Sequence, residues 1–63
     1  MPTIIVEGPP LADLDKKRKL VAEMSAAASE AYAIPVEAMV VIITESPPEN
    51  VGVGGRLIVD RRK

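Results

Sequence analysis

The sequence predicts an α/β fold in which two parallel strands and the helix between them form one β-α-β unit. A short β-branched run at residues 3–6 precedes a helical pattern, and a longer apolar run follows at residues 39–44. Some thirty residues that include a helix separate the two runs, as in the right-handed crossover between parallel strands. These observations predict a single domain over residues 1–63.

The first strand and the helix have clear ends in the sequence. Consecutive prolines at residues 9–10 end the strand, because proline cannot donate to a ladder. Asp13 is expected to cap the helix, and Pro35 ends it at about residue 33 or 34. One apolar stripe at three- and four-residue spacing predicts the packed face of the helix: Leu20, Val21, Met24, Ala27, Ala28 and Ala31.

The second half of the chain begins with its strongest strand signal. Residues 39–44 are almost continuously apolar, which suits a strand covered on both faces. Residues 46–50 are typical of a loop, and the glycines within residues 52–55 favour a tight hairpin. Residues 57–59 are expected to form a short third strand or hairpin arm.

The composition indicates self-association. A chain of 63 residues buries little of its surface, yet 48% of these residues are apolar. Small domains compensate with disulfides, metals or oligomerisation. The sequence has neither cysteine nor histidine, so no metal site and no disulfide is expected. We therefore expect a homo-oligomer in which copies share a sheet.

Charge and hydropathy argue against several classes of partner. The net charge of −1 gives no field that favours nucleic acid or an anionic membrane. No apolar run approaches the ~20 residues of a membrane span, and no secretory signal is evident. We expect a cytoplasmic protein that binds neither nucleic acid nor membranes.

The missing residue types also restrict the chemistry. Without histidine or cysteine, a general base must come from a carboxylate, a lysine, Tyr32, a hydroxyl or the amino terminus. Pro2 follows the initiator methionine, whose removal would leave a secondary amine at the head of a strand. An unperturbed α-amino group has a pKa of about 7.7–8.0, and burial lowers it towards the useful range of a base.

Three features together resemble the 4-oxalocrotonate tautomerase family over essentially the whole chain: Pro2, the VIITE segment at residues 41–45 and the GVGG segment at residues 52–55. The resemblance implies a hexamer of paired β-α-β subunits and a keto–enol tautomerase that needs no cofactor. It implies Pro2 as the catalytic base on a 2-hydroxydienoate or related enol, such as 2-hydroxymuconate or phenylenolpyruvate. It also suggests a place in aromatic catabolism.

The chain departs from the family at the substrate-binding positions. Members that act on 2-hydroxymuconate have arginines at the positions of Ala12 and Val40 and a phenylalanine at that of Val51. The predicted substrate-binding residues here are Val40, Val51, Asn50 and Arg56, with Arg56 as a substitute cation. The basic runs at residues 16–19 and 61–63 are expected to be a solvated helix face and a mobile tail.

Two alternatives remain open at this stage. Dehalogenases and decarboxylases of the superfamily use a protonated proline with an arginine pair, and the missing arginines argue against that chemistry. A non-catalytic assembly or binding module on the same fold is the other alternative, because loss of both arginines is compatible with a retired active site.

Overall fold

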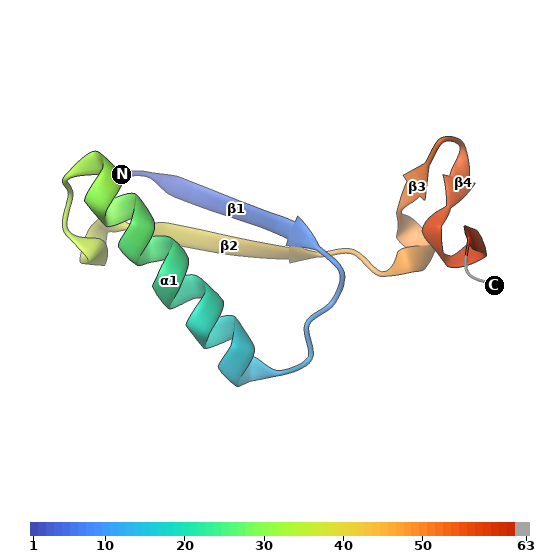
Figure 1. The fold of residues 1–63 in the computed structure, drawn as a ribbon, viewed down its shortest axis with the longest axis horizontal. Coiled ribbons are helices and arrows are strands. Elements are labelled where there is room, and N and C mark those ends of the chain that lie inside the picture. The colour runs from blue at the N-terminus through green and yellow to red at the C-terminus, as the bar shows by residue number, and fades with distance from the viewer. Residues whose placement is uncertain (62–63) are drawn as a thin grey trace.

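The computed structural model describes residues 1–61 and has two parts (Figure 1). A β-α-β unit comprises β1 (Thr3–Gly8), α1 (Leu14–Tyr32) and β2 (Val40–Glu45). A smaller C-terminal unit, residues 48–61, contains β3 (Gly52–Val53) and β4 (Arg56–Leu57). Short 3-10 turns complete the chain at Val36–Ala38, Pro48–Asn50 and Ile58–Arg61. Arg62 and Lys63, part of the expected basic tail, lie outside the described residues.

The sheet confirms the predicted β-α-β topology. β1 pairs with β2 in parallel, with Thr3 opposite Val40 and Gly8 opposite Glu45. β3 and β4 form an antiparallel hairpin whose turn contains Gly54 and Gly55, both at positive φ. The expected arm at residues 57–59 is wrong in its extent, because the chain leaves β4 after residue 57 and turns into a 3-10 helix.

Both ends of α1 match the prediction. The Asp13 carboxylate accepts a hydrogen bond from the Asp15 N–H at 2.9 Å and caps the first turn. Ala33 ends the helix in the left-handed region with φ 59°, and its N–H donates to the Ser29 carbonyl. The Ser29 hydroxyl also donates to the Ile34 carbonyl, which fixes the chain reversal before Pro35.

The packed face of α1 differs in part from the expected apolar stripe. Ala27 and Ala31 are exposed, whereas Ser25 is the most buried residue of the helix and Ser29 is half-buried. The more buried positions of α1 therefore include small serines as well as apolar residues. A pattern of apolar residues alone could not identify these two positions.

The isolated chain does not enclose a core. Its accessible surface is 4902 Å², against about 3,900 Å² for a compact chain of this mass. Its radius of gyration is 15.0 Å, against roughly 10.6 Å expected for its length. Within residues 1–61 no apolar side chain is fully buried, and the sheet face away from α1 is open at Ile5 and Ile42.

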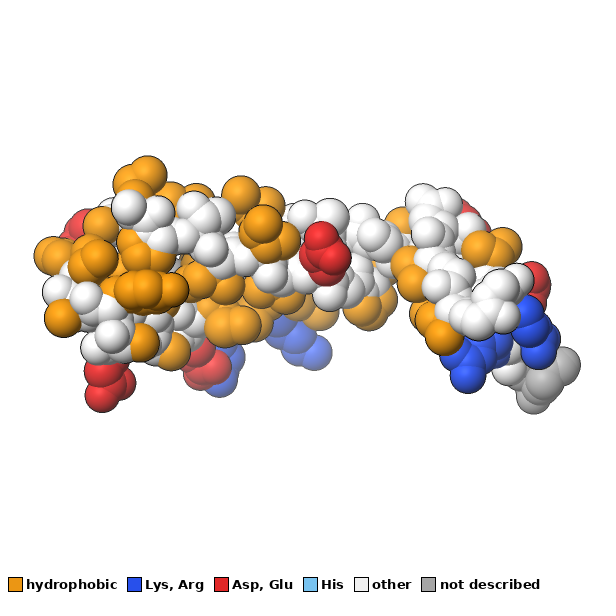
Figure 2. All heavy atoms as spheres, turned by 90° about the horizontal axis from the view of Figure 1, so that it is seen from above, with side chains coloured by type: hydrophobic (Ala, Val, Ile, Leu, Met, Phe, Trp, Pro, Cys, Tyr) orange, Lys and Arg blue, Asp and Glu red, His pale blue; other side chains and the backbone are white. Residues whose placement is uncertain are grey.

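Hydrophobic side chains cover much of the β-α-β unit, and basic side chains lie both along one side of this unit and on the C-terminal unit (Figure 2). No helix in residues 1–61 is both long and apolar enough to cross a membrane.

Candidate functional site

Pro2 and Val40 lie together at the end of the sheet where both strands begin. Pro2 is half-buried directly before β1, and its carbonyl accepts a hydrogen bond from the Val40 N–H at 3.2 Å. This contact follows from the parallel register, which places the starts of both strands side by side. Met1 is 88% exposed.

The other predicted site residues lie at the opposite end of the molecule. Asn50 closes the turn Pro48–Asn50, Val51 follows it, and Arg56 stands in β4. β1 has six residues, which at about 3.3 Å per residue separates its ends by roughly 20 Å. The structure therefore brings Pro2 and Val40 together but does not bring Asn50, Val51 or Arg56 to them within one chain.

A cavity of about 360 Å³ lies where β1 ends and the C-terminal unit begins. Its lining is mostly apolar and comes from both parts of the chain: Glu7, Gly8, Pro9, Ser46, Pro48, Val51 and Ile58. The Ser46 N–H donates to the Gly8 carbonyl at 2.8 Å and joins the two walls. Val51 is the predicted site residue that this cavity contains. Sequence reasoning missed the other members, because proline and serine in loops carry no signal of a cavity.

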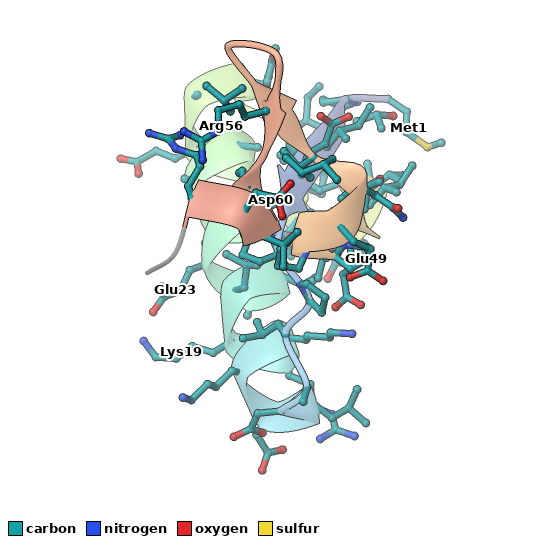
Figure 3. All side chains as sticks on the ribbon, turned by 90° about the vertical axis from the view of Figure 1, so that its right-hand side faces the viewer. Met1, Lys19, Glu23, Glu49, Arg56 and Asp60 are labelled. Carbon is teal, nitrogen blue, oxygen red and sulfur yellow. The ribbon has the colours of Figure 1, made fainter. Side chains whose placement is uncertain are left out.

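Arg56 is exposed at the surface of the C-terminal unit. Its guanidinium Nη2 donates to the Asp60 carbonyl at 3.2 Å, and it points away from Glu49 (Figure 3). No ion pair involving Arg56 is found within residues 1–61. Its charge is thus available to an anion brought by a ligand.

The cations are segregated from Pro2. Every lysine and arginine of the sequence lies in residues 16–19 or 56–63. Residues 16–19 belong to the start of α1, which follows the end of β1, and residues 56–61 belong to the C-terminal unit (Figure 1). Ala12, in the loop between β1 and α1, provides no charge. Among residues 1–61 of the same copy, no basic side chain therefore lies near a substrate carboxylate bound at Pro2.

Glu45 joins the end of β2 to the loop after β1. Its Oε2 atom accepts from the Leu11 N–H at 3.1 Å and lies 2.7 Å from the Lys17 Nζ atom. The hydrogen bond from Lys17, and after it that from Leu11, hold the pKa of Glu45 below its usual value. Lys17 is 29% exposed, so the expectation of a wholly solvated lysine face is wrong at this position. Sequence reasoning gave Glu45 no role, because its partners are distant in the chain.

Residues 1–61 contain no group of three or more acidic side chains placed to hold a metal ion. At the Pro2 end the structure offers a half-buried proline beside the start of β2. At the other end, the cavity provides apolar walls, and Asn50 and Arg56 provide polar groups nearby.

Comparison with known proteins agrees with this architecture. A sequence model of the family described as "Tautomerase enzyme" matches residues 2–61. The crystal structure of DmpI from Archaeoglobus fulgidus is 47% identical, with a TM-score of 0.84 over 94% of this chain and 100% of that one. TomN, a 4-oxalocrotonate tautomerase homologue of the tomaymycin biosynthetic pathway, is 38% identical, with a TM-score of 0.87 over 95% of this chain and 92% of that one.

A heterohexamer 4-oxalocrotonate tautomerase from Chloroflexus aurantiacus is 29% identical, with a TM-score of 0.87 over 98% of this chain and 100% of that one. No curated protein matches the chain significantly. The family match covers nearly the whole chain and begins at Pro2. The chain therefore belongs to the tautomerase superfamily, among its 4-oxalocrotonate tautomerase-like members.

Proposed function

We propose that this chain is a keto–enol tautomerase whose general base is the secondary amine of Pro2 after removal of Met1. The observation that carries the proposal is the place of Pro2, half-buried at the head of β1 in a chain whose family match begins at that residue. Removal of Met1 is essential, because a proline nitrogen acylated by Met1 is an amide and cannot act as a base. The exposure of Met1 leaves it accessible for removal.

The reaction moves one proton and needs no cofactor. The Pro2 amine takes the hydroxyl proton of a 2-hydroxydienoate or simpler enol, the C–O bond becomes a carbonyl, and the double bonds shift along the chain. The protonated amine then returns the proton to a distant carbon, so the substrate is isomerised without net gain or loss. Apolar surroundings lower the pKa of such an amine and keep it free to accept a proton near neutral pH.

We propose that the site forms between two copies. Identical subunits most often pair about a two-fold axis, and two β1 edges joined in one sheet in this way run antiparallel. Antiparallel pairing puts the start of one β1 beside the end of the other. Pro2 of one copy then meets the cavity at Gly8 and Val51 of the next, and the two ends that lie roughly 20 Å apart within one chain come together.

In this arrangement Val40 comes from the same copy as Pro2, and the partner copy provides the other substrate-binding groups. Val40 and the partner's Val51 give apolar contact, Asn50 can donate a hydrogen bond to a substrate oxygen, and Arg56 can bind a substrate carboxylate. One cation in place of two arginines favours a monocarboxylate such as phenylenolpyruvate over the dicarboxylate 2-hydroxymuconate.

We further propose that the assembly is a homohexamer. The excess exposed surface of the isolated chain calls for partners, and the related protein from Chloroflexus aurantiacus is described as a heterohexamer. Paired copies share a sheet, and association of the pairs then covers the open face of that sheet.

Intact mass and turnover together test the base. The intact mass of the purified protein should show that Met1 has been removed. Ketonisation of both enols is followed by ultraviolet absorbance. Pro2→Ala should lower kcat by at least about a hundredfold, the usual contribution of a positioned base. Met1 absent with unchanged turnover in Pro2→Ala would exclude Pro2 as the base.

Mixing of subunits tests the shared site. Pro2→Ala and Val51→Asp are each expected to be weakly active, since one replaces the rigid secondary amine of proline with a flexible primary amine and the other places an acid in the substrate cavity. After unfolding and joint refolding, some sites combine an intact Pro2 from one parent with an intact Val51 from the other, so activity should return. The control is a mixture of the two variant proteins that has not been unfolded, so that their subunits do not exchange. Mixed oligomers that stay inactive would place the whole site within one copy.

A non-catalytic assembly module is the second candidate. The absence of charge at Ala12 and Val40 favours it, because nothing at these positions orients a dicarboxylate. It requires either retention of Met1 or lack of turnover on both enols with Met1 removed, and the same mass and absorbance measurements distinguish it.

A further inference from the structure

Glu45 ties the loop between β1 and α1 to the end of β2. A backbone N–H and a lysine amine converge on its carboxylate, at 3.1 Å from Leu11 and 2.7 Å from Lys17. Glu45 and Lys17 are 30% and 29% exposed, so this ion pair is much less solvated than the other two of residues 1–61. Partial burial makes such an interaction stronger than an exposed pair.

The loop that Glu45 holds forms one wall of the cavity. Pro9 lines the cavity, and Leu11 follows two residues later in the same loop. Ser46, the residue after Glu45, also lines the cavity, and its N–H donates to the Gly8 carbonyl at 2.8 Å. Glu45 thus binds Leu11 and its neighbour Ser46 binds Gly8. These two hydrogen bonds fix the loop at two points, one on each side of Pro9.

We propose that Glu45 is a positioning residue, which sets the width of the substrate cavity by holding residues 9–11 against the end of β2. The inference rests on the proposed function, in which this cavity receives the substrate next to Pro2 of another copy. Glu45 acts through the loop and does not touch the base. Its loss should therefore weaken substrate binding and leave the proton transfer itself nearly unchanged.

Three variants separate the contributions. Glu45→Ala removes both interactions and should raise KM for phenylenolpyruvate roughly tenfold, the equivalent of one charge-assisted hydrogen bond, with kcat within about twofold. Glu45→Gln keeps an acceptor for the Leu11 N–H and should recover most of this loss. Lys17→Met keeps the Leu11 hydrogen bond and should raise KM by about threefold or less.

Glu23→Ala is the matched control. Glu23 pairs with Lys19 at the same 2.7 Å distance, but the two side chains are 67% and 72% exposed. Both extend outwards from α1 (Figure 3). KM and kcat should stay unchanged in this variant. If KM rises equally in Glu23→Ala and Glu45→Ala, the rise reflects a general loss of stability, and the inference is overturned.

Hydrogen–deuterium exchange provides a readout that does not require turnover. Amide exchange in residues 11–13, which begin with the Leu11 N–H that Glu45 binds, should become faster in Glu45→Ala, less so in Glu45→Gln, and should not change in Glu23→Ala. Unchanged exchange rates in Glu45→Ala would overturn the inference. If Pro2→Ala abolishes turnover but Glu45→Ala leaves KM unchanged, the inference is likewise overturned. Turnover that persists in Pro2→Ala would instead refute the proposed base and leave the exchange result to decide on Glu45.

Discussion

The open face of the sheet allows a quantitative test of assembly. Ile5 and Ile42 are directly opposite each other in the β1–β2 ladder and point away from α1. Ile5 is 59% exposed and Ile42 47% exposed in the isolated chain. If other copies cover this face, the double variant Ile5→Ala/Ile42→Ala removes apolar contacts that exist only in the oligomer.

The exposed fractions set the expected magnitude. Full burial of an isoleucine side chain contributes roughly 1.5–3 kcal/mol. The part still exposed in one copy would then contribute about 1–2 kcal/mol at Ile5 and about 0.7–1.4 kcal/mol at Ile42. Loss of most of this contribution weakens association by about 2–3 kcal/mol per copy, or roughly 30- to 150-fold.

Sedimentation equilibrium across a range of protein concentrations measures the effect. Leu14→Ala is the matched control, because Leu14 is 57% exposed but lies in the first turn of α1. The double variant should dissociate at much higher concentrations than the unmodified protein, and the control should not. Equal dissociation of both variants, or dissociation of the Leu14 variant alone, would refute the assignment of this face to the interface.

Three further predictions concern stability. The hydrogen bonds from Lys17 and Leu11 lower the pKa of Glu45 from 4.5, so its ionised form stabilises the fold above that pH and the stabilisation is lost as pH falls through the folded pKa. Glu45→Gln should therefore flatten the decline of Tm below pH 4.5, and parallel Tm profiles would contradict this. Ala33→Gly should stabilise the chain by about 1 kcal/mol in chemical denaturation, because φ at Ala33 is 59°; lower stability would show that the left-handed residue is not strained. Ser29→Ala should cost about 1 kcal/mol in the same assay, because the Ile34 carbonyl loses its hydroxyl donor, and an unchanged midpoint would show that water replaces the hydroxyl.

The sequence predicted those parts of the fold that local chemistry determines. Two prolines after Gly8, a capping aspartate and Pro35 gave the order and limits of β1, α1 and β2, and the crossover rule gave their parallel pairing. The hairpin followed from Gly54 and Gly55, whose positive φ values need glycine. The packed face of α1 was less predictable, because small serines occupy some of its more buried positions.

The candidate site was predictable only as separate residues. Pro2 and Val40 come together because the parallel pairing places the starts of β1 and β2 side by side. The bond from Leu11 to Glu45 spans 34 residues, and no pattern in the sequence marks it. The cavity likewise depends on how the C-terminal unit folds back towards the end of β1, which propensities do not determine.

Stability and chemistry have the same origin in this chain. Two strands and one helix leave one sheet face and the strand edges uncovered, so the chain gains stability chiefly by association. Within residues 1–61, the same geometry separates the proposed base from the lysines and arginines and from the cavity by about the length of β1. Pairing that covers the edges also joins these opposite ends. Dilution should therefore abolish activity at the concentrations at which it dissociates the copies, and a dissociated chain that retained full turnover would refute both the shared site and the reason proposed for it.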